Sequence, residues 1–216
     1  MLVAILRYLR GIGMIFDRLQ KKIRNIGNTR KYVKGDKESI SISNINIDVR
    51  HPDTFKGGVI MGRESYLNGS VCFETNTGSL IIGNNTYLGG VSIITKDEVR
   101  IDDNVQIAWN VLIYDHNAHS FNYLERQKDM KVFWDNAKRG FDALGNHGKN
   151  WDVVYSAPIH ICSNSWIGTN VIILSGVTIG EGAIIGAGSV VRDSIPAWAI
   201  AYGNPCKVVS YNKYHE

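Results

Sequence analysis

A period of six residues constrains this chain most. From residue 161 onward a branched apolar residue returns at every sixth position, namely Ile161, Ile167, Ile173, Ile179, Ile185 and Val191. A spacing of six fits neither the 3.6-residue turn of an α-helix nor the two-residue alternation of one long strand. It is typical of short strands joined by tight turns, in which each strand points one apolar residue into a narrow core. The repeat therefore predicts a parallel β-helix.

The same register continues upstream, with interruptions. Apolar residues six apart occur in three further groups, which are Met61, Leu67 and Phe73; Ile82, Leu88 and Ile94; and Ile101, Ile107 and Ile113. Three hexapeptides make one triangular coil, so we expect about five coils, stacked at about the 4.8 Å spacing of neighbouring strands. Gly, Asn and Asp between the strands tolerate the positive φ of tight corners. Each coil buries its apolar residues only by stacking on the next one.

Motifs near the end of the chain carry a resemblance to a known family. Trp166-Ile-Gly-Thr-Asn, Ile185-Gly-Ala-Gly-Ser and Gly203-Asn-Pro-Cys-Lys resemble the hexapeptide-repeat acyltransferases. The branch includes the galactoside and maltose acetyltransferases and many bacterial polysaccharide O-acetyltransferases. The resemblance is dense over residues 159–209 and looser over 60–116. It implies an all-β fold, a left-handed parallel β-helix, and a homotrimer with active sites at its interfaces.

The remaining segments flank or interrupt the repeat. We expect a basic amphipathic helix over 1–30, the β-helix domain over 31–209 and a C-terminal tail over 210–216. The repeat stops after Ile113, at the third clear coil, and an extended loop over 117–157 leaves the coil there. Loops of this length in a compact domain are usually functional or disordered, and the aromatic content of this one argues against disorder. We expect it to arch over a neighbouring subunit and wall a cleft.

Net charge, cysteine content and hydropathy limit the possible partners and settings of the protein. The net charge of +4 is too mild to indicate nucleic acid as a partner. The three Cys show no ligand spacing, which favours a reduced, cytoplasmic setting. The sequence contains no stretch of about twenty apolar residues that could span a bilayer.

Residues 1–26 interleave Arg and Lys with apolar residues. This helix either packs on the β-helix or a neighbouring subunit, or binds peripherally to the anionic inner face of the cytoplasmic membrane.

One histidine is the candidate general base. Acyl transfer from a thioester requires the acceptor hydroxyl or amine to lose a proton, and an imidazole suits that task. The resemblance places this role on His116, which would abstract the acceptor proton and return it to the CoA thiolate, without an acyl-enzyme. His119 is a supporting candidate. Asp115 also supports the site, but adjacent side chains on a strand point apart, so it is expected to cap the turn or face the acceptor.

The resemblance implies acetyl-CoA as the acyl donor and no metal. Small residues would line the pantetheine arm and cations would meet the phosphates. The donor-binding candidates are Trp166, Thr169, Ala187, Gly188, Arg192, Asn204 and Lys207. The candidates on the acceptor side are Tyr87, Trp109 and Trp134 for sugar stacking, and Gly89, which stands where galactoside-type enzymes have a sugar-binding Asn.

The primary functional hypothesis is an acetyl-CoA-dependent O-acetyltransferase that modifies a sugar of a bacterial surface polysaccharide or its nucleotide- or lipid-linked precursor. Other acceptors remain open, namely a nucleotide-linked amino sugar acetylated on nitrogen, or a xenobiotic. A γ-type carbonic anhydrase would need three histidines on one metal, with His116, His119 and His160 as the candidates. A non-enzymatic β-helical scaffold is the last alternative.

Overall fold

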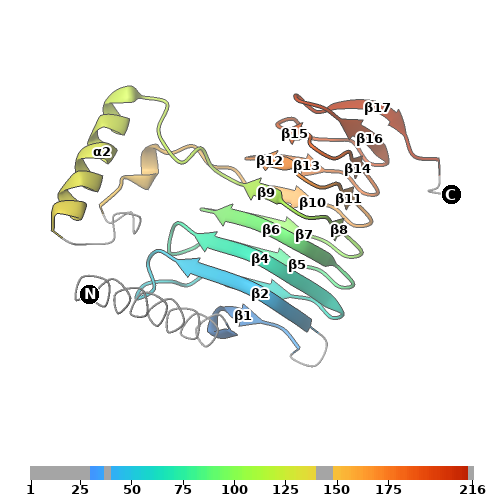
Figure 1. Ribbon diagram of the computed structural model, residues 1–216, viewed down its shortest axis with the longest axis horizontal. Helices are drawn as coiled ribbons and strands as arrows, with labels where there is room; N and C mark the ends of the chain where they lie inside the picture. Colours follow the sequence, from blue (N-terminus) through green and yellow to red (C-terminus); the bar gives the residue numbers. More distant parts are fainter. Residues whose placement is uncertain (1–29, 37–39, 140–147, 214–216) are drawn as a thin grey trace, which may run out of the picture.

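A computed structural model of the protein describes residues 30–36, 40–139 and 148–213 (Figure 1). The basic helix expected over 1–30, with its packing or membrane role, lies outside this part of the chain apart from residue 30. The described chain forms a parallel β-helix, as the repeat predicts, and it is left-handed, as the resemblance implies. In Figure 1 its coils rise from the N-terminal strands at one end of the stack to the C-terminal strands at the other.

One face of the β-helix is a six-stranded parallel sheet. Each strand comes from a different coil, and adjacent coils pair along the whole face. In spatial order the strands are β1 (Val33–Lys34), β3 (Gly58–Met61), β5 (Ser79–Ile82), β7 (Glu98–Ile101), β10 (Ile159–Ile161) and β13 (Thr178–Ile179).

The second sheet wraps the other two sides of the stack. In the lower coils it consists of long bent strands, which are β2 (Ile40–Val49), β4 (Ser65–Phe73) and β6 (Tyr87–Thr95). In the upper coils a corner divides each long strand into two short ones. The first side then holds β8 (Gln106–Ile107), β11 (Trp166–Ile167) and β14 (Ile184–Ile185), and the second holds β9 (Val111–Tyr114), β12 (Ile172–Leu174) and β15 (Val190–Val191). The stack is closed by β16 (Ala199–Tyr202) and the antiparallel β17 (Lys207–Tyr211).

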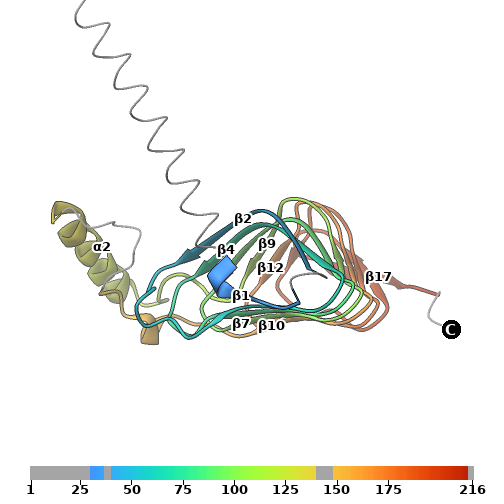
Figure 2. The same ribbon diagram turned by 90° about the horizontal axis from the view of Figure 1, so that it is seen from below.

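The hexapeptide residues form straight columns inside the stack. One column on each side contains only residues that are 4% exposed or less. The columns are Met61, Ile82, Ile101, Ile161 and Ile179; Leu67, Leu88, Ile107, Ile167 and Ile185; and Val71, Ile93, Ile113, Ile173 and Val191. Every member of the predicted series from 161 to 191 therefore lies in the core. Figure 2 shows the coils overlying one another around this common interior.

One predicted core position is wrong. Ile94 is only half-buried, and Ile93 fills the column instead. Leu88 pairs with Ile107 and Val91 pairs with Val111, so two residues turn this corner where three do in the next coil. Gly90, with φ of 114°, adopts a conformation that most side chains disfavour and makes the shorter corner feasible. A corner one residue shorter reverses which side chains of the following strand point inward.

The stack also extends further upstream than the hexapeptide pattern indicates. The strands β1 and β2 add a coil below Gly58, and β2 pairs with β4 over nearly its whole length. The period of six is not kept here, because the residues of β2 that pair with Leu67 and Val71, namely Ile42 and Ile47, are five apart. Its alternation of Ile with Ser and Asn has a period of two, which is the pattern of a strand with one buried side.

The extended loop contains a helix that the sequence analysis did not anticipate. The helix α2 (Tyr123–Lys138) begins at Asn122, whose Oδ1 accepts a hydrogen bond from Leu124 N at 3.0 Å. None of its residues is buried, and it stands beside the coils in both views (Figures 1 and 2). Two short 3-10 helices, η1 (Arg30–Tyr32) and η3 (Trp151–Val153), complete the described elements. No helix in the described ranges is both long and apolar enough to cross a bilayer.

The corrected register can be tested by paired alanine substitutions. We expect Ile93→Ala to lower the free energy of unfolding by about 2 to 5 kcal/mol, because it leaves a cavity in a column of fully buried side chains. The neighbouring Ile94→Ala is the matched control and should cost clearly less. Urea unfolding of both variants measures the difference. Equal losses, or a larger loss at Ile94, would contradict the register.

Candidate active site

The candidate site lies at the corner where the extended loop leaves the β-helix. The strand β9 ends at Tyr114, and the chain turns at Asp115 and His116. The two ends of the loop meet there, because Asn117 N donates to Tyr155 O and Ala157 N donates to Asp115 O, each at 3.0 Å. The departure and the return of the loop are thus both fixed to one corner of the rigid coil stack.

His116 is almost fully buried at this corner, with 3% of its surface exposed. Its ring lies edge-on to Tyr114 and Trp151, at centroid distances of 4.4 and 5.3 Å. Its Nδ1 accepts a hydrogen bond from Ala118 N at 3.0 Å. The buried Nε2 has no hydrogen-bond partner within the described part of the chain. This atom is therefore the one that a bound reactant could contact.

The surroundings of His116 favour a neutral imidazole. Burial lowers its pKa to about 4, and the positive charges of Lys149 and Lys96 act in the same direction. A neutral ring is the form that can accept a proton. Because Nδ1 already accepts the Ala118 N–H, the neutral ring carries its hydrogen on Nε2. A general base at Nε2 needs the opposite tautomer, so the turn at Ala118, where φ is 60°, must change when reactants bind.

Asp115 holds the neighbouring corner together. Its carboxylate is completely buried and accepts three hydrogen bonds, from Thr95 Oγ1 at 2.6 Å, Lys96 N at 2.8 Å and Asp97 N at 3.0 Å. Burial raises its pKa, and these hydrogen bonds oppose the shift. None of them goes to the imidazole of His116. Asp115 thus joins two successive coils directly beneath the candidate base.

The supporting candidate His119 contacts a residue that the sequence analysis did not assign, Asp129, and two more such residues, Lys149 and Trp151, lie at the same corner. His119 Nδ1 lies 2.8 Å from Asp129 Oδ2 on α2, and Lys149 Nζ lies 3.9 Å from the same oxygen. The Lys149 ammonium also donates to Ala118 O and lies 4.4 Å from the centre of the Trp151 ring. Nothing in the repeat could have placed these residues, because they belong to the loop outside it.

A pocket of about 420 Å³ shares one residue with the ring contacts of His116. Trp151 belongs to both features, since it contacts the His116 ring and lines the pocket. The corners of three coils supply the remaining walls together with η3. The lining residues are His51, Thr54, Thr75, Asn76, Thr77, Lys96, Asp97, Trp151 and Asp152. Polar groups and charges of both signs therefore line this pocket, and His116 is not among its lining residues.

Several donor-binding candidates gather along another edge of the β-helix. Thr169 Oγ1 donates to Trp109 O at 2.8 Å, and Gly188 N donates to Thr169 O at 2.9 Å, so these corners stack in successive coils. Ala187 and Gly188 are exposed there, and a side-chain carbon built on Gly188 would meet nothing within 4 Å. Asn204 is exposed beside the corner that ends in Gly203. The stack presents a strip of small residues that an extended ligand can approach.

Two other donor candidates are charged and lie further along the chain. Arg192 Nε and Lys207 Nζ each lie 3.4 Å from Asp193 Oδ2, so both cations share one carboxylate. Trp166 is 54% exposed on β11. The structure places these three side chains on the surface, and each is accessible to an anionic or flat ligand.

The four acceptor candidates do not line the pocket. Tyr87 stacks on Tyr66 with a centroid distance of 5.1 Å, and Gly89 is buried against the Tyr87 ring. Trp109 is 67% exposed at the edge that carries Thr169, while Trp134 is exposed on α2. Tyr87, Gly89 and Trp109 therefore lie at or beside one stacked corner, since Asn110 N donates to Gly90 O at 2.9 Å, whereas Trp134 lies apart on α2.

Possible metal ligands converge at one place in the described ranges. That group contains Asp102, His160 and Cys162, and so only one histidine. His116 and His119 are not part of it. Within a single described chain the three histidines considered for a carbonic anhydrase centre are not brought together.

Comparisons with known proteins match the repeat. The family model described as bacterial transferase hexapeptide (six repeats) matches residues 158–193. A Staphylococcus aureus (strain COL) protein named "Putative acetyltransferase" is 56% identical over 66 residues, which are 31% of this chain and 33% of that protein. The chain thus spans about a third of that relative's length. The galactoside O-acetyltransferase of Escherichia coli (strain K12) is 33% identical over 152 residues, covering 69% of this chain and 62% of that protein.

A solved structure has the same fold. The crystal structure of the polySia specific acetyltransferase NeuO aligns with 84% of this chain and 81% of its own, with a TM-score of 0.55 and 23% sequence identity. The shared architecture is the left-handed β-helix of hexapeptide proteins.

The role of Asp115 can be tested by removing one acceptor oxygen. We expect Asp115→Asn to lower the free energy of unfolding by about 1 to 3 kcal/mol, because the amide that replaces this buried carboxylate cannot accept from all three donors. The control is Asp193→Asn, whose side chain is 58% exposed and which should change stability little. Urea unfolding distinguishes them. Similar small changes in both variants would show that Asp115 does not hold the corner.

The burial of His116 predicts an acid-sensitive component of stability. The folded-state pKa of about 4 lies below the ordinary value of 6.5, so the unfolded chain binds the proton first as the pH falls. Stability should therefore decrease between about pH 6.5 and pH 4, and this part should be absent in His116→Gln. Unfolding free energies of both proteins across this range measure it. Parallel pH profiles would contradict a depressed pKa.

Proposed function

Because this chain has the repeat and the fold of the hexapeptide-repeat acyltransferases, we propose that it transfers an acetyl group from acetyl-CoA to a sugar hydroxyl. The acceptor is a bacterial surface polysaccharide or its nucleotide- or lipid-linked precursor. The single observation that carries the proposal is His116, a buried neutral imidazole whose Nε2 has no partner in the described ranges and whose ring contacts Trp151, a residue that also lines a polar pocket. The 33% identity to a galactoside O-acetyltransferase supports a sugar as the acceptor class.

In the proposed reaction His116 acts as the general base. Once the Ala118 N–H no longer occupies Nδ1 and the ring hydrogen lies on Nδ1, the free Nε2 takes the proton of the sugar hydroxyl as the oxygen attacks the thioester carbonyl. Nε2 then gives this proton to the departing CoA sulfur. The aromatic rings of Tyr114 and Trp151 hold the imidazole plane. His119 supports the site indirectly, because its contact with Asp129 ties the 116–119 turn to α2.

The acceptor occupies the pocket that Trp151 joins to His116. The pocket offers threonine hydroxyls, an asparagine amide and charged groups, which suit the hydroxyls and substituents of a sugar. Lys96 is held there by Val154 O and Ser156 Oγ, at 3.3 and 2.9 Å. Lys96 lines the pocket together with Asp97 and Asp152, so hydrogen-bond donors and acceptors of both signs are available to a sugar.

The donor binds along the edge that carries Thr169, Ala187 and Gly188. The strand β9, four residues long, separates this edge from the corner of His116. At about 3.3 Å per residue, the two features are roughly 13 Å apart within one chain. We therefore propose a homotrimer in which the donor edge of one subunit faces His116 of the next. Arg192 and Lys207 are the cations proposed for the CoA phosphates.

Two further proposals concern the setting of the protein. We place it in the cytoplasm, in line with its three unpaired thiols. The basic segment 1–26 would hold it at the inner face of the membrane, near lipid-linked acceptors, and flotation with anionic vesicles tests this.

The role of His116 can be tested by following thiol release from acetyl-CoA. Against a panel of nucleotide sugars and oligosaccharides, we expect His116→Ala to lose at least about a hundredfold in turnover, as expected for a general base. His119→Ala should lose much less turnover, because it removes the contact of the turn with Asp129 and leaves the general base in place. Turnover in His116→Ala equal to that of the wild type would overturn the assignment.

Mixed oligomers test whether the site is shared. Ala187→Trp places a bulky ring on the proposed donor edge, so this variant and His116→Ala should each be inactive alone. If the sites lie between subunits, co-assembled trimers of both variants regain part of the activity, since some interfaces combine an intact His116 with an intact Ala187. Mixtures without any recovery would favour a site within one chain.

A further inference from the structure

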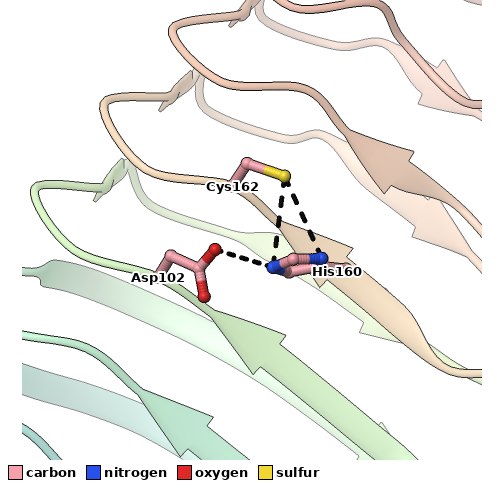
Figure 3. A group of neighbouring side chains, drawn as sticks. All are labelled: Asp102, His160 and Cys162. Carbon is pink, nitrogen blue, oxygen red and sulfur yellow. Dashed lines mark hydrogen bonds and ion pairs between the residues drawn. The ribbon is translucent and has the colours of Figure 1, made fainter.

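A second cluster of chemically reactive side chains lies on the outer surface of the β-helix. Asp102 follows β7, and His160 and Cys162 lie on and just after β10, in the next coil (Figure 3). The His160 Nε2 lies 2.7 Å from Asp102 Oδ2, and Cys162 Sγ lies 3.9 Å from Nδ1 and 4.0 Å from Nε2. This corner follows the six-stranded sheet, whereas the corner of His116 precedes it.

The backbone explains why the three side chains meet. Arg100 pairs with His160 and Ile101 pairs with Ile161, so Asp102 and Cys162 occupy adjacent positions in successive coils. Ile161 points into the core, which leaves His160 and Cys162 on the same outer side of the strand. Asp102 N also donates to Ile161 O at 2.9 Å. The ligand positions are thus set by paired strands rather than by a loose loop.

We propose that Asp102, His160 and Cys162 bind a zinc-like divalent ion, which links the coil before the extended loop to the coil after it. A carboxylate, an imidazole and a thiolate are all ordinary zinc ligands. Each of the three residues offers one ligand atom, and these atoms lie within 4.8 Å of one another. The side chains of His160 and Asp102 are 39% and 25% exposed, so solvent can supply the fourth ligand.

The cluster needs only a small adjustment to accept the ion. Ligand atoms of a tetrahedral zinc site lie about 3.3 to 3.6 Å apart, given metal–ligand distances of about 2.0 to 2.3 Å. In this structure the nitrogen–oxygen separation is shorter and the sulfur–nitrogen separations are longer. Side-chain rotations that move Nε2 away from Asp102 Oδ2 and bring Cys162 Sγ toward Nε2, each by less than about 1 Å, would bring these two separations into the range of zinc sites.

Neighbouring charges affect both the ligand residues and the ion that they would bind. Arg100 Nε lies 3.0 Å from Asp102 Oδ1, which orients the carboxylate and leaves Oδ2 for the ion. Burial raises the pKa of the Cys162 thiol, and the carboxylates of Asp102 and Glu181 raise it further. The same negative charges attract a cation. When the ion binds, the thiol proton is released to solvent and a sulfur–metal bond takes its place.

Cobalt(II) titration of the chelator-treated full chain tests the proposal directly. Thiolate coordination produces a charge-transfer absorption band, which we expect in the wild type with one ion per chain. Cys162→Ser should abolish the band, and His160→Gln should weaken binding at least about tenfold. The matched control is Cys72→Ser, which alters another half-buried thiol and should keep the band. No band in the wild type, or a band unchanged in Cys162→Ser, would overturn the proposal.

Thermal unfolding with zinc gives an independent measurement. An ion that binds only the folded chain raises the melting temperature, so the wild type and Cys72→Ser should gain stability with zinc. Cys162→Ser should not. An equal increase in Cys162→Ser would place the zinc elsewhere and exclude this cluster.

Discussion

The pairing of each coil with the next is the interaction on which the rest of the structure depends. A single coil supplies one or two apolar residues per side, which is far too little to form a core alone. Stacking turns these residues into columns such as Val71, Ile93, Ile113, Ile173 and Val191, in which every member is at most 2% exposed. The parallel ladder fixes which residues of adjacent coils are neighbours. It therefore also fixes which corner residues meet on the outside.

The candidate site lies at a corner that the paired coils hold in a fixed position. Asp115 accepts three donors from the corner of the coil below, so the residue before His116 is anchored by buried hydrogen bonds. The loop that begins here closes back on the same corner through Tyr155 and Ala157. The imidazole consequently receives its position from the stack and its environment from the loop. The hydrogen bonds of Asp115 to the stack fix the backbone before His116, and the returning loop covers the ring. A side chain at the start of a long insertion can therefore be both buried and well oriented.

The sequence predicted the repetitive part of this molecule and little of the rest. The period of six placed Ile161 to Val191 in the core because one residue per strand must point inward. It failed at Ile94, where the corner at Gly90 is one residue shorter, and at β2, whose alternation has a period of two. Lys149, Asp129 and Trp151 could not be placed at all, because their positions depend on how the loop folds back. The resemblance to a family led to His116, but only the structure shows that its Nδ1 accepts the Ala118 N–H.

That hydrogen bond bears on how the chain would catalyse acyl transfer. With Nδ1 occupied, Nε2 carries the hydrogen, and the free chain holds His116 as a donor rather than as a base. Ala118 has the left-handed conformation, which costs a non-glycine residue about 1 to 2 kcal/mol. The ammonium of Lys149 binds Ala118 O and is itself tied to Asp129 on α2. Asp129 and Lys149 thus connect the exposed α2 to the turn that selects the tautomer. For the proposed general base, this turn would have to change before Nε2 could accept a proton.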